Sequence, residues 1–293
     1  MSALTRRLID VAANLSDSSF RPDLPQVLQR AKSAGVLKFL LAGSSLPESQ
    51  KAYEACLQDP DCYCTLGVHP CRANVRPIQE VDRDSYFEEM TALVGRFGRK
   101  LVAIGECGLD YDRLHYSSKE QQLAAFPPHF ALAESTHLPM YLHSRNSEGD
   151  FNRLIRTHRD QFTTGLVHSY TGSVEELREL LDMGLYIGVN GCSLKTTENV
   201  EVVRSIPLDR LMIETDCPYC EIRKSHAGFR YVKTHFATCK KEKRNPDLPV
   251  RGRNEPLLIV QVMEAVAGIK EVSEEEVAAV TTENAMKVFG FQA

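Results

Sequence analysis

Short runs of apolar residues with little polar alternation recur along the whole chain, and glycine or polar residues separate them. Such runs are typical of strands that are buried on both faces, as in a parallel sheet. They predict strands over Leu8–Leu15, Lys38–Gly43, Tyr63–His69, Leu101–Glu106, Pro139–His143, Gly165–His168, Leu185–Asn190 and Leu211–Asp216.

Segments in which apolar residues recur at helical spacing lie between these strands. Several of these segments begin with a helix-start signature, such as Ser-Val-Glu-Glu at Ser173, in which a serine side chain caps the first turn. The predicted helices are Asp23–Gly35, Ser45–Leu57, Ser117–His137, Ser173–Gly184, Glu198–Ile206, Glu255–Gly268 and Ser273–Val288.

Strands that alternate with helices over this length are the pattern of a (β/α)8, or TIM, barrel in the α/β class. The main alternative, a doubly wound sheet, requires a glycine-rich phosphate loop after an early strand. The first strand here leads instead into Asn14-Leu15-Ser16-Asp17. No linker divides the chain, so we predict one domain over residues 1–293. The segment 217–254 after the eighth strand has no clear apolar period, which is typical of a lid or binding loop.

Composition places the chain among ordinary globular proteins, with 293 residues, 43% hydrophobic and 25% charged. No apolar run approaches the roughly 18 residues of a membrane span, and the N-terminus lacks the apolar core of a secretory signal. The nine cysteines are an odd number at scattered spacings, which favours reduced thiols. We therefore expect a monomer of the cytosol or the nucleus that has no membrane partner.

Five of the predicted strands end at, or close to, a side chain that can bind a metal ion: His69, Glu106, His143, His168 and Asp216. In a barrel the carboxyl ends of the strands meet at one rim, so these side chains are expected to converge. A lone histidine after an apolar run is more often a core residue, but five residues in equivalent positions favour a shared site. Carboxylate and imidazole ligands suit Mg²⁺, Mn²⁺ or Zn²⁺.

The chain resembles the TatD family of metal-dependent deoxyribonucleases. The resemblance rests on motifs in family order over nearly the whole chain: DVAANLSD, AGVLKFLLAG, LGVHP, VAIGECGLDYDR, LPMYLHSRN, VHSYTG, YIGVNGCS, LMIETDCP and RGRNEP. The segment KSHAGFRYVKT is similar to an insertion of the eukaryotic cytosolic and nuclear branch. The resemblance implies an amidohydrolase-like TIM barrel that hydrolyses DNA, including 3′-to-5′ exonuclease action on single strands with Mg²⁺. It also suggests a role in DNA repair or DNA degradation.

By the same resemblance, Glu106, His143, His168 and Asp216 are metal ligands, and His69 contacts the scissile phosphate or a bound water. We expect Asp216 to orient or deprotonate the attacking water, although it could equally be a ligand only. Glu106 could bridge two ions, as in a two-metal site.

Many relatives begin with Asp-x-His-x-His at the first strand, whereas this chain has Asp10-Val11-Ala12-Ala13-Asn14. The missing histidines leave one metal position with fewer protein ligands. This favours Mg²⁺, which keeps several waters, over a caged Zn²⁺, and leaves open whether one or two ions bind. Asn14, at the place of the second histidine, is predicted to bind substrate.

The segment from Arg223 to Arg253 contains ten Lys or Arg and two acidic residues, a net charge of +8 in a chain of −4, so the remainder carries −12. A basic segment beside a metal site predicts contact with a polyanion such as DNA. Phe229, Tyr231 and Phe236 could stack on bases, or could instead dock on the barrel. Three arginines near the site motifs are predicted to bind phosphate or to pair with a barrel acid: Arg113, Arg145 and Arg253.

Cysteines form two further patterns. Cys217-Pro218-Tyr219-Cys220 has the CxxC spacing of a redox motif, but it follows a barrel strand and does not open a thioredoxin-like helix. A loose set of Cys217, Cys220, His235 and Cys239 could hold a structural Zn²⁺. Two alternatives to a deoxyribonuclease remain open: a metallohydrolase of amides or esters, and a catalytically weak nucleic-acid-binding barrel.

Overall fold

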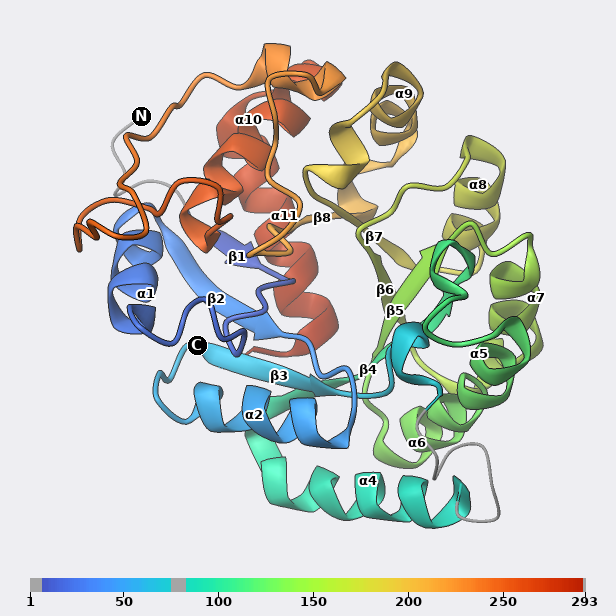
Figure 1. Cartoon of the computed structure of the whole chain (residues 1–293). Coiled ribbons are helices and arrows are strands. Elements are labelled where there is room, and N and C mark those ends of the chain that lie inside the picture. The colour runs from blue at the N-terminus through green and yellow to red at the C-terminus, as the bar shows by residue number, and fades with distance from the viewer. Residues whose placement is uncertain (1–6, 75–82, 292–293) are drawn as a thin grey trace.

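A single sheet of parallel strands forms the centre of the molecule, and the strand order follows the chain from β1 to β8 (Figure 1). The computed structural model describes residues 7–74 and 83–291. The strands are β1 (Leu8–Asp10), β2 (Val36–Leu41), β3 (Cys62–Leu66), β4 (Leu101–Asp110), β5 (Met140–Arg145), β6 (Gly165–His168), β7 (Tyr186–Val189) and β8 (Leu211–Ile213). Helices surround this sheet, so the predicted TIM barrel is confirmed.

The first and last strands meet just beyond their carboxyl ends. Ala13 and Cys217 form an isolated parallel bridge. The backbone amide of Asp216 donates to the Ala12 carbonyl at 2.8 Å, and the amide of Asn14 donates to the Cys217 carbonyl at 2.9 Å. These bonds join the two ends of the sheet at the rim where the predicted site residues lie.

Ten helices in the described residues pack around the barrel (Figure 1). They are α1 (Leu24–Ser33), α2 (Leu46–Cys56), α4 (Arg83–Phe97), α5 (Lys119–Ala125), α6 (Pro128–Thr136), α7 (Asp150–Thr157), α8 (Val174–Asp182), α9 (Thr197–Ser205), α10 (Ile259–Lys270) and α11 (Glu274–Phe289). The capping box predicted at Ser173 is present, because its hydroxyl accepts from the Glu176 amide and the Glu176 side chain bonds back.

The predicted long helix over Ser117–His137 is wrong, since the structure has two helices there. α5 ends at Ala125 and α6 begins at Pro128. Pro127 and Pro128 have no amide hydrogen and cannot continue the α-helical ladder from α5. Helices α4 and α7 were not predicted, although α4 buries Met90, Leu93 and Phe97 at helical spacing.

Two hydrophobic cores hold the barrel together. The larger core lies between the strands and the surrounding helices. The smaller core includes Tyr141 and Met212 on the strands, with Val288 and Phe289 of α11 packed against it. Asn284 of α11 also bonds to the carbonyls of Leu208 and Leu211, where β8 begins. Helix α11 therefore covers the amino end of the barrel and leaves the carboxyl end for the site.

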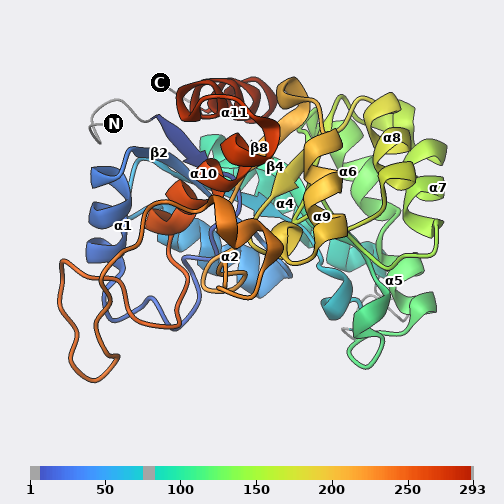
Figure 2. The ribbon, with the colours of Figure 1, turned by 90° about the horizontal axis from the view of Figure 1, so that it is seen from above.

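The segment after β8 is long and mostly irregular, with a short 3₁₀-helix at Ala227–Tyr231. In Figure 2 it lies on the side of the molecule away from α11. Glu264 of α10 accepts the backbone amides of Lys233 and Thr234 at 2.8 and 2.9 Å. Three aromatic side chains of this segment pack, partly buried, against the larger core: Phe229, Tyr231 and Phe236. This packing supports the docking alternative over stacking on bases.

Among the residues that the structure describes, no helix combines the length and the apolar character that crossing a bilayer requires. The expectation about a secretory signal falls partly on residues 1–6, which lie outside the described residues.

Candidate active site

A cavity of about 960 Å³ opens at the carboxyl end of the barrel. Its lining comes from the ends of the strands or from the loops that follow them, as expected for a barrel enzyme. The cavity contains all five side chains that were predicted from the strand ends: His69, Glu106, His143, His168 and Asp216.

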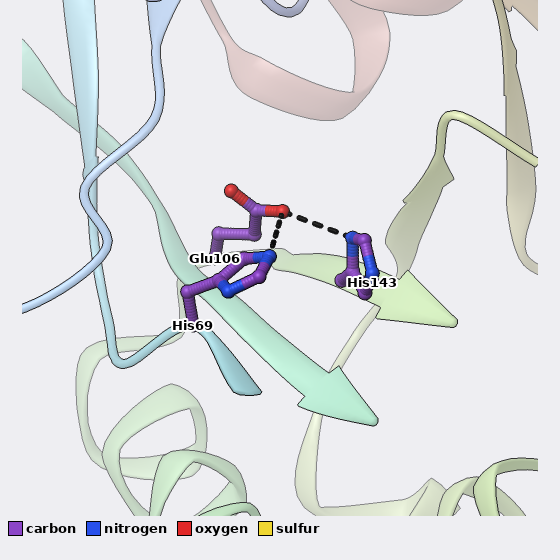
Figure 3. A group of neighbouring side chains, drawn as sticks. All are labelled: His69, Glu106 and His143. Carbon is purple, nitrogen blue, oxygen red and sulfur yellow. Dashed lines mark ion pairs between the residues drawn. The ribbon is translucent and has the colours of Figure 1, made fainter. Parts of the chain in front are cut away.

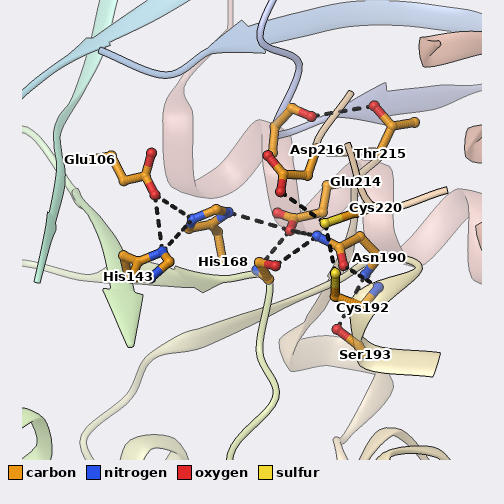
Figure 4. Close-up of polar contacts among 12 residues, drawn as sticks. Glu106, His143, His168, Asn190, Cys192, Ser193, Glu214, Thr215, Asp216 and Cys220 are labelled. Atoms are coloured by element: carbon orange, nitrogen blue, oxygen red, sulfur yellow. Dashed lines mark hydrogen bonds and ion pairs between the residues drawn. The ribbon is translucent and has the colours of Figure 1, made fainter. Parts of the chain in front are cut away.

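Glu106 lies at the centre of this group, and three histidines face one of its oxygens (Figures 3 and 4). Glu106 Oε1 is 2.8 Å from His168 Nε2, 3.1 Å from His143 Nδ1 and 3.4 Å from His69 Nε2. His143 Nδ1 and His168 Nε2 are themselves 3.3 Å apart. Side chains from three strands and one loop thus direct their polar atoms into the same small volume.

The position of Glu106 corrects the sequence analysis, because β4 continues past it to Asp110. The pairing register between β4 and β5 shifts between Gly105 and Cys107, so Glu106 is the extra residue of a bulge. Gly105 has φ +133°, and a Cβ there would lie 2.0 Å from the Tyr141 carbonyl oxygen. Glycine therefore permits the bulge that turns the Glu106 side chain towards the cavity.

The buried charges of the group stabilise one another. Burial alone would raise the pKa of Glu106, but the histidines around it, through the charge of His168 and hydrogen bonds from His143 and His168, hold it well below its usual range. Burial alone would lower the pKa of His168, yet Glu106 and Glu214 raise it well above its usual value. The pKa of His143 is also raised, because Asp110 and Glu106 outweigh burial. An anionic carboxylate at the bottom of the cavity therefore attracts positive charge.

The histidines differ in the partner of the ring nitrogen that faces away from Glu106. His143 Nε2 is 3.3 Å from Asp110 Oδ2, and His168 Nδ1 is 3.5 Å from Glu214 Oε1. A carboxylate behind a histidine can hold the ring proton on that side when the cavity-facing nitrogen binds a metal. Asp110 is hydrogen-bonded to His143 in this way, whereas Glu214 is near His168 Nδ1 without a hydrogen bond to it. Sequence reasoning missed Asp110 and Glu214, although both acids lie close to predicted ligands in apolar motifs.

His69 has the opposite arrangement. Its Nδ1 accepts the backbone amide of Cys71 at 3.0 Å, so the neutral ring carries its proton on Nε2. Burial lowers the pKa of His69 to about 4, which keeps the ring neutral. The possible ligand atoms of His69, Glu106 and His143 lie within 4.8 Å of one another. Distance alone would thus make His69 a ligand, but its protonated Nε2 makes it a hydrogen-bond donor.

Asp216 lies in the same cavity and receives two hydrogen bonds, of which Figure 4 shows the one from Cys220. Asn14 Nδ2 donates to its Oδ1 at 2.9 Å, and the Cys220 thiol donates to its Oδ2 at 3.1 Å. Burial raises the pKa of Asp216 to about 6. Asn14 also lines the cavity, so it both reaches the predicted substrate region and orients Asp216.

Two buried acids support the rim from below, and sequence reasoning gave neither a role. Asp10 accepts the Thr215 amide at 2.9 Å and the Thr215 hydroxyl at 2.6 Å, which links β1 to the residue before Asp216. Burial raises the pKa of Asp10 to about 8. Glu214 accepts the Ser169 amide at 2.7 Å and Asn190 Nδ2 at 2.9 Å (Figure 4).

The three predicted phosphate-binding arginines have different positions. Arg113 and Arg145 line the cavity, where Arg145 pairs with Asp112 at 2.8 Å. Arg253 is not among the lining residues. Its guanidinium is buried and lies 2.7 Å from both Asp23 and Glu255. For Arg253 the structure supports the alternative of pairing with an acid.

The loose cysteine and histidine set is not brought together. In the described part of the chain, the group of ligands that lies close enough to share an ion is the one around Glu106, and it contains none of the four residues of this set. Cys239 instead directs its thiol at the Leu248 carbonyl, and Cys217 is fully buried. The hypothesis of a structural zinc at Cys217, Cys220, His235 and Cys239 is therefore wrong.

The family model described as TatD related DNase matches residues 9–290. The chain belongs to this family. It is 40% identical to a protein of Schizosaccharomyces pombe named deoxyribonuclease Tat-D, over 96% of this chain and 95% of that one. It is 32% identical to a protein of Klebsiella pneumoniae named 3′-5′ ssDNA/RNA exonuclease TatD, over 97% and 98% of the two chains. A solved structure of a TatD family hydrolase from Entamoeba histolytica matches with TM-score 0.91 and 34% identity, over 98% and 99%.

Membership of the TatD family confirms the resemblance and implies a divalent metal ion. The residues present fit such an ion. His143 and His168 direct ring nitrogens at an ionised Glu106, and a divalent ion in that place would replace the protons that these nitrogens share with the carboxylate. Imidazole with carboxylate is a donor set for Mg²⁺, Mn²⁺ or Zn²⁺.

Proposed function

We propose that this TatD family chain is a metal-dependent deoxyribonuclease that hydrolyses phosphodiester bonds of single-stranded DNA from the 3′ end. One observation carries the proposal: carboxylate-backed His143 and His168 meet an ionised Glu106 in the cavity at the carboxyl end of the barrel. The 3′-to-5′ direction is taken from the name of the bacterial relative.

Glu106, His143, His168 and Asp216 are the proposed ligands. We propose Mg²⁺ as the ion, with Mn²⁺ or Zn²⁺ as alternatives and one or two ions bound, because Ala12 and Asn14 supply no imidazole at the first strand. When bound, a divalent ion supplies charge stabilisation to the phosphodiester and lowers the pKa of a water molecule.

Three protein residues have separate roles in the proposed hydrolysis. His69 donates a hydrogen bond from its Nε2–H to a non-bridging oxygen of the scissile phosphate, where charge develops in the transition state. Asp216 accepts the proton of the attacking water, and its raised pKa of about 6 suits that role. Asn14 donates to Oδ1 of Asp216 and the Cys220 thiol donates to Oδ2, so the two contacts orient the carboxylate that takes up the proton.

The cavity rim favours a single strand as substrate. Few large hydrophobic side chains are strongly exposed in the described residues, and two of them, Tyr116 and Tyr219, line this cavity at 49% and 59% exposure. Exposed aromatic rings stack on unpaired bases, which a duplex does not offer. Four cations line the same cavity for phosphate contact: Arg72, Arg113, Arg145 and Lys195. We also propose a monomer in the cytosol or the nucleus, in keeping with nine free cysteines.

The test is cleavage of a 5′-labelled single-stranded DNA by the wild type and by Glu106→Ala, in Mg²⁺ and in EDTA. We expect a ladder that shortens from the 3′ end, requires metal and disappears in the variant. No cleavage with Mg²⁺, Mn²⁺ or Zn²⁺ would reject the proposal and favour another hydrolytic substrate or a binding role. Cleavage that survives Glu106→Ala would keep the activity but reject the metal site.

The strand preference has its own control. Tyr219→Ala should raise KM for single strands about tenfold, since one base stacked on an aromatic ring contributes about 1–3 kcal/mol. Tyr219→Phe keeps the ring and should behave as the wild type. Equal KM values for single and double strands in the wild type would contradict the proposed preference.

A further inference from the structure

Two cysteines from different loops face each other at the wall of the active-site cavity. Cys192 and Cys220 have their sulfur atoms 2.8 Å apart, and both residues line the cavity (Figure 4). We propose that this pair is a redox modification site, at which a peroxide forms a reversible Cys192–Cys220 disulfide that lowers the activity of the enzyme.

The fold holds the two thiols together. Cys192 opens a 3₁₀-helix, Cys192–Leu194, after β7, whereas Cys220 follows β8. A Cβ on Gly191 would lie 2.0 Å from the Cys220 carbonyl oxygen, so the two backbones are in direct contact there. A disulfide bond is about 2.05 Å long, so the sulfur atoms need to approach by less than about 1 Å.

Polar contacts fix both loops to the site. Asn190 accepts the Cys192 amide at 2.8 Å and donates to Glu214 at 2.9 Å. Asn254 donates to the Tyr219 carbonyl at 2.6 Å, next to Cys220. These anchors keep the thiols near each other while the cavity exposes them to a small oxidant.

The other cysteines do not offer such a pair to solvent. Six of them are buried, and Cys71 lines the cavity without a second thiol recorded beside it. In particular Cys217, the first cysteine of the CxxC pattern, is fully buried. The geometry therefore pairs Cys220 with Cys192 and not with its neighbour in the sequence.

The chemistry balances with a peroxide as the oxidant. The thiolate of one cysteine attacks a peroxide oxygen, which breaks the O–O bond, gives a sulfenic acid and releases water after protonation. The thiolate of the other cysteine then attacks the sulfenic sulfur, forms the S–S bond and displaces hydroxide, which takes up a proton. With hydrogen peroxide, two thiols are oxidised by two electrons and the peroxide is reduced to two waters. A dithiol reverses the change by thiol–disulfide exchange.

The disulfide would act on the proposed catalytic carboxylate. In the reduced protein the Cys220 thiol donates to Asp216 Oδ2 at 3.1 Å. A disulfide has no proton, so Asp216 would keep only the hydrogen bond from Asn14. Hydrogen bonds to charged groups contribute about 1.5–3 kcal/mol, which corresponds to a change in rate of roughly tenfold or more. This effect on activity rests on the proposed function, whereas formation of the disulfide does not.

Peptide mapping tests the bond directly. The metal-free protein is treated with hydrogen peroxide in EDTA, alkylated and digested without reductant, and the cross-linked peptides are identified by mass. We expect a peptide that joins Cys192 to Cys220 in the wild type and in Cys217→Ser, and none in Cys192→Ser. A Cys217–Cys220 link, or oxidation of single cysteines without a link, would overturn the proposal.

DNA cleavage then tests the consequence. Oxidised wild type, reloaded with metal, should lose at least about tenfold in rate and recover with dithiothreitol. Cys192→Ser should keep the basal rate before and after peroxide treatment. A fully formed disulfide with unchanged activity would refute the regulatory role. If even the reduced enzyme cleaved no DNA, the proposed function would fail, while the peptide map would still decide the disulfide.

Discussion

His69 and His143 both direct a ring nitrogen at Glu106 Oε1, at 3.4 and 3.1 Å. The partner on the far side of each ring separates their roles. Cys71 donates its amide to His69, so that the proton of the neutral ring lies on the cavity side, whereas Asp110 can accept the proton of His143 when the cavity-facing nitrogen binds an ion. The same residue type at nearly the same distance is thus the proposed donor in one place and the proposed ligand in the other.

Matched truncations should separate these roles. His143→Ala is expected to weaken metal binding by about 100-fold or more, because it removes a ligand. His69→Ala should keep the metal Kd within about threefold of the wild type while kcat falls about 100-fold, since only the donor to the phosphate is lost. Isothermal titration with Mn²⁺ and initial rates measure the two effects. Loss of metal affinity in His69→Ala would make His69 a ligand.

Much of the site could be predicted at the residue scale. An acid or a histidine after an apolar run pointed to His69, Glu106, His143, His168 and Asp216, and the structure brings all five into one cavity. The sequence could not reveal which nitrogen faces which partner. Asp110 and Glu214 act through that hidden geometry, and nothing in their spacing gives the orientation of an imidazole ring.

At the scale of single elements, the sequence identified every strand but not where some of them bend. β4 looked complete at Glu106, because a carboxylate normally ends a buried apolar run. The structure keeps the strand to Asp110 and inserts Glu106 as a bulge beside Gly105. For Arg253 the sequence left open whether it binds phosphate or pairs with an acid, since nearness to a site motif does not give the direction of a long side chain.

Arg253 ties the segment after β8 to α1, where Asp23 lies at the helix start. Arg253→Met should lower the free energy of unfolding by about 1–3 kcal/mol, because Asp23 loses its nearest cation and Glu255 keeps only Arg30 as a partner. KM for DNA should stay near the wild-type value well below the unfolding temperature. Arg145→Met is the matched control, with the opposite outcome: a raised KM and little change in urea unfolding. Weaker DNA binding by Arg253→Met without destabilisation would contradict this assignment.

His129 links helix α6 to the turn that carries His69. Its Nε2 accepts the Val68 amide at 3.0 Å, and burial lowers its pKa to about 4. An unfolded histidine titrates near 6.5, so between about pH 6.5 and 4 the unfolded chain binds more protons than the folded chain. Acidification through that window should therefore remove about 3 kcal/mol of stability through this residue.

The measurement compares urea unfolding of the wild type and of His129→Gln at several pH values in EDTA. Glutamine can accept the Val68 amide but does not titrate. As the pH falls from 7 to 4, the free energy of unfolding should decrease more for the wild type than for His129→Gln. Parallel stability curves would show that His129 is not the titrating group.

At the scale of the whole molecule, the packing of α11 and the candidate active site lie at opposite ends of the barrel. Helix α11 covers the amino end of the barrel, and the cavity lies at the carboxyl end with cations on its rim. The segment after β8 adds a concentrated positive charge to an otherwise acidic chain. Its basic residues from Arg223 to Arg251 are exposed, although they are not in the cavity lining. Composition predicted this charge contrast, but only the structure could show that Phe229, Tyr231 and Phe236 pack against the core while Tyr219 stays exposed.

If the basic segment guides the strand towards the cavity, the salt dependence of DNA binding should reveal it. Each phosphate contact adds about 0.7 to the slope of log affinity against log salt for a single strand. Replacing Lys240, Lys241, Lys243 and Arg244 with serine should therefore reduce the slope by about 2–3. Anisotropy of a labelled single strand measures it, with Glu106→Ala as the background to prevent cleavage.

A second fourfold variant makes this test specific. Arg96, Arg99, Arg178 and Lys287 are exposed and do not line the cavity. Changing them to serine also moves the formal net charge from −4 to −8. A contact between DNA and the segment predicts a reduced slope in the first variant only, because counterions are released where phosphates are bound. An equal reduction in both variants would mean that net charge alone attracts the DNA, and the segment would then have no binding role.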